Sequence, residues 1–160
     1  MNQRPQTRLT VKFSDCDPFG HLYNVRYLDY LFDGREQHVI EHYPLLRTEM
    51  MSRQRNWVIA ATDIRYLHPA ALGECVIIES SVFNITRHGV MLEIAMLDAA
   101  AIRPKAVLWS RLQYVDLERG AIVYHPPQVQ AFLDEVGVAL DAASLDARVK
   151  ALLQGVPTAA

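Results

Sequence analysis

The residues best suited to chemistry lie together at positions 14–24, in the run S-D-C-D-P-F-G-H-L-Y-N. They include two carboxylates (Asp15 and Asp17), one imidazole (His21) and one amide (Asn24). A carboxylate can attack a carbonyl carbon directly, or it can activate a water molecule for that attack. These groups are therefore suited to the transfer of an acyl group to water. The alternative is structural, because aspartates in loops rich in proline and glycine often only cap and turn the chain.

A long helix is predicted directly after this run. Apolar residues recur on one helical face at Val25, Leu28, Phe32, Val39 and Tyr43. Asn24 is a favoured N-cap and Pro44 a natural stop, which gives a helix of about 20 residues. The N–H groups and the dipole at such a helix start can hold a developing oxyanion, and Gly20 allows the backbone to approach a ligand closely. Because Gly34 costs about 1 kcal/mol relative to alanine in a helix, we expect a close packing contact there.

The other predicted elements are strands, followed by two short helices. Period-2 alternation predicts strands at Arg8–Ser14, Trp57–Leu67, Glu74–Ile85, Val90–Ala99 and Ala106–Asp116. Helical periodicity returns at Val129–Val136 and at Leu145–Leu153. A doubly wound sheet would alternate strands and helices throughout, so this order excludes it. We predict an α+β fold forming one domain over residues 1–160, with a core at 8–126 and a helical C-terminal extension at 127–160.

Composition limits the class of protein. The chain has 160 residues, of which 51% are apolar and 21% charged, which is enough to bury a core and excludes general disorder. A net charge of −2 excludes a generally basic nucleic-acid binder. No apolar run approaches the roughly 18 residues that cross a bilayer, and the first residues lack the apolar segment of a signal peptide. Cys16 and Cys75 predict reduced thiols. We expect a soluble, cytoplasmic protein that binds neither nucleic acid nor membrane.

The motif F-S-D-C-D-P-F-G at 13–20, followed by Tyr23 and Tyr27, resembles that of the 4-hydroxybenzoyl-CoA thioesterase family. The order of the predicted elements follows this family too. The resemblance implies the hotdog fold, in which one long helix is wrapped by a five- or six-stranded, mainly antiparallel sheet. It also implies hydrolysis of an acyl-CoA thioester without metal or organic cofactor, coenzyme A being part of the substrate. Asp17 would be the general base or nucleophile, and N–H groups around Tyr23 and Asn24 would bind the thioester carbonyl.

The other residues of the run have competing interpretations. His21 is either a hydrogen-bond donor to the substrate or the attacking water, or a helix-entry residue bonded to backbone. Asn24 is favoured as an N-cap over a catalytic amide, and Asp15 as a loop organiser. Cys16 lies between two carboxylates that oppose thiolate formation, so it is not expected to be a nucleophile. The segment H-L-Y-N at 21–24 is closer to the H-V-N-N element of long-chain acyl thioesterases, which leaves both aromatic and aliphatic acyl groups open.

Residues outside the run complete the predicted site. The acyl pocket is assigned to Phe19, Tyr27, Trp57 and Ile59, although a tyrosine such as Tyr27 is usually a packing residue in a core helix. Candidates for binding the phosphates of coenzyme A are Arg87, His88, Arg103 and Lys105, at predicted turns where basic residues are usually only solvated. His38 and His42 are spaced as a metal-binding pair, but no third ligand completes a set, so no metal site is predicted.

Two other functions are alternatives to thioester hydrolysis. A hotdog enoyl-CoA hydratase would carry D-x-N-P-x-H, whereas here Asp17 replaces the asparagine and the histidine falls one residue late. A non-catalytic acyl-CoA-binding protein is the other alternative.

A sheet wrapped around one helix leaves an unpaired edge strand, which proteins usually cover. The resemblance implies a homodimer, or a dimer of dimers, in which Asp17 faces the partner's segment Trp57–Thr62.

Overall fold

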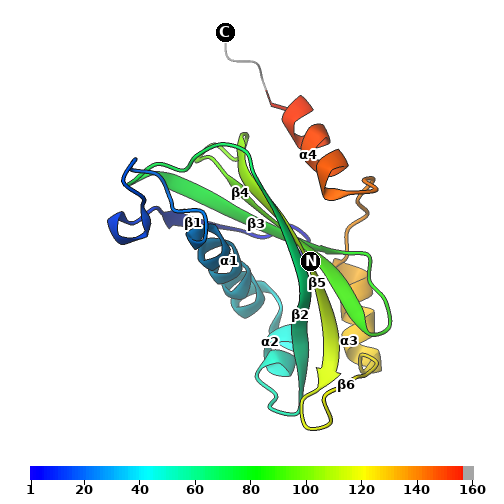
Figure 1. Ribbon diagram of the computed structural model, residues 1–160. Helices are drawn as coiled ribbons and strands as arrows, with labels where there is room; N and C mark the ends of the chain where they lie inside the picture. Colours follow the sequence, from blue (N-terminus) through cyan, green and yellow to red (C-terminus); the bar gives the residue numbers. More distant parts are fainter. Residues whose placement is uncertain (157–160) are drawn as a thin grey trace.

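A curled sheet wraps around a long helix in the computed structural model, which describes residues 1–156 (Figure 1). The strands are β1 (Gln6–Thr10), β2 (Arg55–Tyr66), β3 (Cys75–Phe83), β4 (Gly89–Leu97), β5 (Pro104–Asp116) and β6 (Ala121–Ile122). The order across the sheet is β1-β3-β4-β5-β2, with the short β6 paired to the end of β5, and every pairing is antiparallel. This architecture confirms the predicted α+β class.

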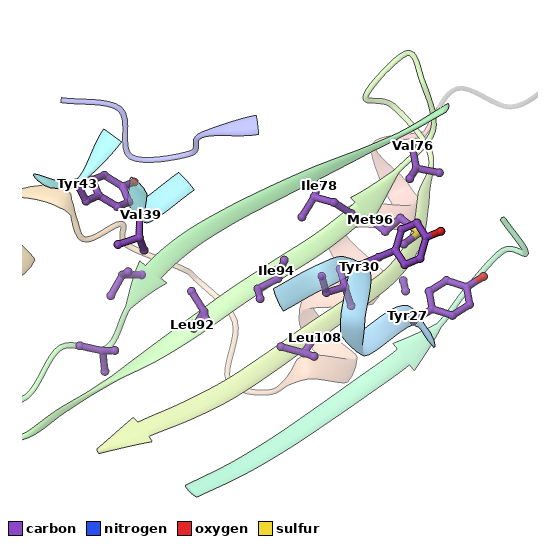
Figure 2. Packing of buried hydrophobic residues seen from close by; sticks show 14 of the residues in the cluster. Tyr27, Tyr30, Val39, Tyr43, Val76, Ile78, Leu92, Ile94, Met96 and Leu108 are labelled. Atoms are coloured by element: carbon purple, nitrogen blue, oxygen red, sulfur yellow. The ribbon is translucent and has the colours of Figure 1, made fainter. Parts of the chain in front are cut away.

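Helix α1 (Arg26–His42) lies on the concave face of the sheet and forms most of the core with it. Alternate residues of β3, β4 and β5 point at the helix, among them Ile78, Ile94 and Leu108 (Figure 2). A Cβ added at Gly34 would lie 2.6 Å from Cγ2 of Ile78, closer than carbon atoms can approach. The expected close contact at this glycine is therefore confirmed, and it is a contact between α1 and β3.

The C-terminal helices lie on opposite faces of the sheet. Helix α3 (Pro127–Val136) buries Val129 and Leu133 in the same cluster as α1, whereas α4 (Leu145–Gln154) packs Leu145 on the other face. The chain passes from one face to the other around the edge of the sheet, where the N–H of Val138 donates to the carbonyl of Val82 (2.8 Å). The predicted extension thus consists of two helices, and its residues 157–160 lie outside the described part of the chain.

The structure differs from the sequence prediction in the segments on both sides of α1. The first strand ends at Thr10 rather than at 14, because its partner β3 begins at Cys75, directly opposite Thr10. The next residues form a short 3₁₀ turn at Phe13–Asp15 instead. After α1 the chain forms a second helix, α2 (Pro44–Met50), which was not predicted from the sequence. Proline ends α1 as expected, but it is also favoured in the first turn of a helix and so begins α2.

Strand β2 is an edge of the sheet and is unusually exposed. It pairs only with β5, and it carries a bulge between Ile59 and Ala61. Residues 58–63, most of them apolar or small, are all exposed, including Val58 (39%) and Ile59 (52%). A long apolar edge with unpaired backbone groups is a surface that proteins normally cover.

Candidate active site

The loop between β1 and α1 is held against the loop before β3 by backbone hydrogen bonds. The N–H of Leu22 donates to the carbonyl of Ala70 (2.8 Å), and that of Leu72 donates to the carbonyl of Gly20 (2.9 Å). Gly20 has φ +74°, a left-handed conformation that a side chain would strain. These bonds fix the positions of the polar residues that the loop carries.

Asp17 both organises this loop and keeps one oxygen free. Its Oδ1 accepts from the N–H groups of Phe19 (2.9 Å) and His21 (3.1 Å), while its Oδ2 has no hydrogen-bond partner within residues 1–156. The structural and the chemical interpretations of this aspartate are therefore compatible, because each requires a different oxygen. The loop orients the carboxylate without using up its second acceptor.

Asp15 lies on a different side of the loop. Its Oδ2 accepts a hydrogen bond from the hydroxyl of Tyr30 (2.8 Å), and this hydroxyl in turn accepts from the N–H of Lys12 (3.0 Å). Its Oδ1 is 3.8 Å from Nε of Arg26. Burial raises the pKa of Tyr30, and the hydrogen bond to Asp15 raises it further. These contacts are those of a loop organiser and separate Asp15 from the groups around Asp17.

Asp17 lines a cleft of about 270 Å³ at the start of α1. The polar side chains around it are those of His21, Asn24, Tyr27, Tyr66 and His68. The structure thus brings together four of the residues that the sequence selected. The imidazole of His21 is half-buried, and within the described chain it has no hydrogen-bond partner, neither backbone nor side chain.

Two tyrosines shape the cleft. The hydroxyl of Tyr27 accepts from the N–H of Ala70 (3.0 Å), and burial raises the pKa of Tyr27. The hydroxyl of Tyr66 donates to the carbonyl of Asn24 (2.9 Å), and the two tyrosine rings meet edge to face, 5.2 Å apart. Tyr27 is only 3% exposed, so it serves as a core residue and as a wall of the cleft at once.

Tyr66 and His68 were missed by the sequence interpretation. Nδ1 of His68 lies 2.8 Å from the carbonyl oxygen of Pro104, which can only accept. The proton of a neutral His68 is therefore on Nδ1, and Nε2 is left as an acceptor. The available signal was the H-P dipeptide at 68–69, which ends β2 at the end of the sheet where α1 begins.

The predicted N-cap at Asn24 is wrong. Val25 is the N-cap residue, but its backbone is already helical (φ −70°, ψ −23°), and no side chain caps the helix. The N–H of Arg26 instead donates to the carbonyl of Tyr23 (2.8 Å), which makes the first turn tight. Within residues 1–156 the N–H groups of Asn24 and Val25 have no acceptor. The helix start therefore presents two free donors beside the cleft.

The four residues predicted for the acyl pocket are not brought together. Tyr27 lines the cleft, Phe19 is 82% exposed on the loop, and Trp57 and Ile59 line a second cavity between the helices and the sheet. Nε1 of Trp57 donates to Nε2 of His125 (3.1 Å). Tyr23, assigned to the carbonyl-binding region, exposes 52% of its surface and contributes its backbone to the helix start.

The candidates for phosphate binding separate into two groups. Arg103 is exposed at the end of the sheet where the cleft lies, whereas Arg87 and His88 are in the turn at the opposite end. The nine residues of β4 separate the two ends by roughly 27 Å. Lys105 is a correction: its Nζ is buried, 2.7 Å from Oε1 of Glu74, and donates to the carbonyl of Pro69 (2.9 Å). It therefore has no free charge for a phosphate.

Within residues 1–156, no group of three His, Cys, Asp or Glu side chains is arranged to hold a metal ion. The rings of His38 and His42 are 6.5 Å apart, and Nδ1 of His38 is bound to Oγ of Ser80 (2.7 Å). Separately, none of the described helices is both long enough and apolar enough to pass through a bilayer.

Comparison with protein families decides where the chain belongs. The profile of the thioesterase-like superfamily matches residues 11–133, which include the cleft, α1 and strands β2 to β6. The chain belongs to this superfamily. A search of curated proteins found no match to the sequence of this chain.

Solved structures of known and probable thioesterases share the fold of this chain, which is the hotdog fold. A 1,4-dihydroxy-2-naphthoyl-CoA thioesterase from Synechocystis has a TM-score of 0.72 at 14% identity, covering 82% of this chain and 96% of its own. The dynemicin thioesterase, studied with a bound polyene, gives 0.71 at 16% identity, covering 84% and 98%. YbaW, a probable thioesterase from Escherichia coli, gives 0.67 at 19% identity, covering 82% and 94%.

Proposed function

We propose that the protein hydrolyses acyl-CoA thioesters in the cleft at the start of α1. One observation carries this proposal: Oδ2 of Asp17 lies in the cleft at the helix start, and within residues 1–156 it has no hydrogen-bond partner, nor do the N–H groups of Asn24 and Val25 have an acceptor. A thioester carbonyl needs both groups, a base or nucleophile at its carbon and donors at its oxygen. Membership in the thioesterase-like superfamily supports this class of reaction.

Two routes use the same groups. In the first, Oδ2 of Asp17 removes a proton from a water molecule that attacks the carbonyl carbon, and the N–H groups stabilise the resulting oxyanion. The tetrahedral intermediate then collapses to the acid and the coenzyme A thiolate, which takes the proton from Asp17. In the second, Oδ2 attacks the carbon itself and expels the thiolate, and water then hydrolyses the mixed anhydride. Both routes give free acid and coenzyme A, and neither uses a metal or an organic cofactor.

The proposed active assembly is a homodimer joined through β2. The exposed residues 58–63 leave an apolar edge with unpaired backbone groups, which an antiparallel copy of the same strand would cover. A two-fold axis through this edge would place the segment Trp57–Thr62 of the partner subunit opposite the cleft. The substrate would then lie between the two subunits.

A thiol-release assay tests the function. Purified protein is incubated with a panel of aromatic and aliphatic acyl-CoA thioesters, and free thiol is measured; crotonyl-CoA is followed in parallel by its absorbance. Thiol release from at least one thioester, with no loss of crotonyl absorbance, is the expected result. Loss of absorbance without thiol release would instead indicate an enoyl-CoA hydratase. No change in either signal would indicate a non-catalytic binding protein.

A further inference from the structure

A second cavity, of about 260 Å³, lies between α1, α2, α3 and the sheet. Most of its walls are apolar and include Phe32, Val39, Trp57, Ile59, Val82 and Leu92. Arg35 is the single cation of its lining within the described chain. Glu36, on the same helix, is exposed, and so is Ile59, so the cavity opens beside the edge strand β2.

The charge of Arg35 has no counter-ion within residues 1–156. Its guanidinium makes a long hydrogen bond from Nη1 to Oγ of Ser80 (3.5 Å), lies 5.3 Å from the centre of the Tyr43 ring and also interacts with the hydroxyl of Tyr43. A guanidinium carries five N–H donors, so several of its donors have no partner within residues 1–156. Burial lowers the pKa of Arg35, but arginine stays protonated in proteins. A partly desolvated, unpaired cation is unfavourable unless an anion joins it.

The side chains that contact Arg35, Ser80 and Tyr43, are neutral, and the one carboxylate of the cavity lining within the described chain, Glu36, is exposed at its mouth. Nδ1 of His38 is bound to Oγ of Ser80 (2.7 Å), and burial together with the charge of Arg35 lowers the pKa of His38 to about 4. The hydroxyl of Tyr43 donates to the carbonyl of Asn2 (2.7 Å) and is uncharged at neutral pH because burial raises its pKa. Within residues 1–156 no carboxylate forms an ion pair with Arg35, and Glu36 lies at the solvent-exposed mouth of the cavity, so the charge of Arg35 is unpaired inside it.

The cavity and the cleft are linked by shared elements. Helix α1 carries Tyr27 in the cleft and Arg35 in the cavity, eight residues or about 12 Å further along its axis. Strand β2 likewise contributes Tyr66 to the cleft and Ile59 to the cavity. A molecule held by its carbonyl at the helix start can extend along α1 and β2 toward Arg35.

We propose that this cavity receives the distal end of the acyl group and that Arg35 pairs with a carboxylate there. The favoured substrates would be thioesters of dicarboxylic acids, that is, ω-carboxyacyl groups. This inference rests on the proposed thioester hydrolysis for its substrate, but the binding of such a group to Arg35 does not depend on turnover.

Matched ligands test the proposal. Hydrolysis is compared for ω-carboxyacyl-CoA and unsubstituted acyl-CoA of equal chain length, over short to long chains. Binding is measured by calorimetry with the non-hydrolysable thioether analogues of both series. The variants are Arg35→Met, which removes the charge at similar length, Arg35→Lys, which keeps it, and Arg47→Met. Arg47 is an exposed cation on α2, so its variant is the control for the change in net charge.

The wild-type protein should prefer the carboxylated ligand at one or more chain lengths. Arg35→Met should reduce this preference by about 10- to 100-fold, the range for a charged hydrogen bond, while Arg47→Met changes it less than about twofold. Arg35→Lys should retain part of it. Thermal unfolding checks that each variant is folded; replacing an unpaired, partly desolvated cation by an apolar side chain should not lower Tm.

Equal preference in wild-type protein and folded Arg35→Met would overturn the proposal, as would a wild-type preference for the unsubstituted ligands. A lower Tm in Arg35→Met with unchanged preference would assign Arg35 to packing against Tyr43 alone. If no thioester is hydrolysed but the carboxylated thioether binds through Arg35, the proposed function fails and the site stands. If thioesters are hydrolysed without any dependence on Arg35, the site fails and the function stands.

Discussion

Replacing Asp17 by asparagine separates its structural role from its chemical role. The amide oxygen of asparagine can still accept from the N–H groups of Phe19 and His21, which Oδ1 of Asp17 binds at 2.9 and 3.1 Å. What is lost is the negative charge and the basicity of the free Oδ2. Asp17→Asn should therefore keep the loop and remove the group that attacks the thioester or activates water.

The structure sets the size of both effects. The two retained hydrogen bonds change from charged to neutral, a loss of about 1 kcal/mol each at most and less at this partly exposed site. The loss of a positioned base lowers a rate by roughly 10²–10⁴-fold, or about 3–5 kcal/mol in the barrier. Asp17→Asn should thus lower kcat at least a hundredfold while Tm falls only slightly.

Asp15→Asn is the matched control. Oδ2 of Asp15 accepts from the hydroxyl of Tyr30 (2.8 Å), outside the cleft, so this variant should lower Tm and leave most of kcat. Thiol release under saturating substrate and thermal unfolding are measured for both variants. If Asp17→Asn retains most of the wild-type rate, Asp17 has no part in the mechanism. If Asp15→Asn loses more activity than Asp17→Asn, the two roles are reversed.

Three further predictions follow from other parts of the molecule. Light scattering during gel filtration should give a mass of two or four chains; a fully active species at 18.2 kDa would contradict the shared site at β2. Treatment with a chelator should leave thiol release unchanged, and a loss that added metal restores would contradict the proposed chemistry. The pKa of His38 falls from 6.5 to about 4, so the unfolded chain binds this proton at a higher pH than the folded one. The free energy of unfolding should therefore fall from pH 6.5 toward pH 4, by roughly 3 kcal/mol at most, and urea titrations should show a smaller fall in His38→Gln.

Much of the fold could be predicted from the sequence because burial imposes a period on it. Strands β2 to β5 alternate, and the core stripe of α1 repeats at helical spacing, so their positions follow from the residues themselves. The end of β1 could not be predicted in this way. It depends on where β3 begins, which is a long-range pairing between Thr10 and Cys75.

The site was predicted less completely than the fold for the same reason. The D-x-D motif and the helix start are local and were found. The separation of the two aspartates depends on Tyr30, and the burial of Lys105 depends on Glu74, and neither partner is marked by a local pattern. Tyr66 and His68 join the cleft only because β2 ends beside the start of α1.

Several groups without a partner within residues 1–156 lie on α1, on the loop before it and on β2. Oδ2 of Asp17 and the N–H of Asn24 are at the start of α1, the guanidinium of Arg35 is further along it, and the unpaired edge of β2 runs beside both cavities. All of these groups are exposed or half-buried, so water solvates them in the free protein and a bound molecule can replace that water. Because these donors, acceptors and the charge lie on one helix and one strand, a single external molecule could contact them together. A thioester held at its carbonyl, with its acyl chain along α1 and a second subunit across β2, would meet all of them at once.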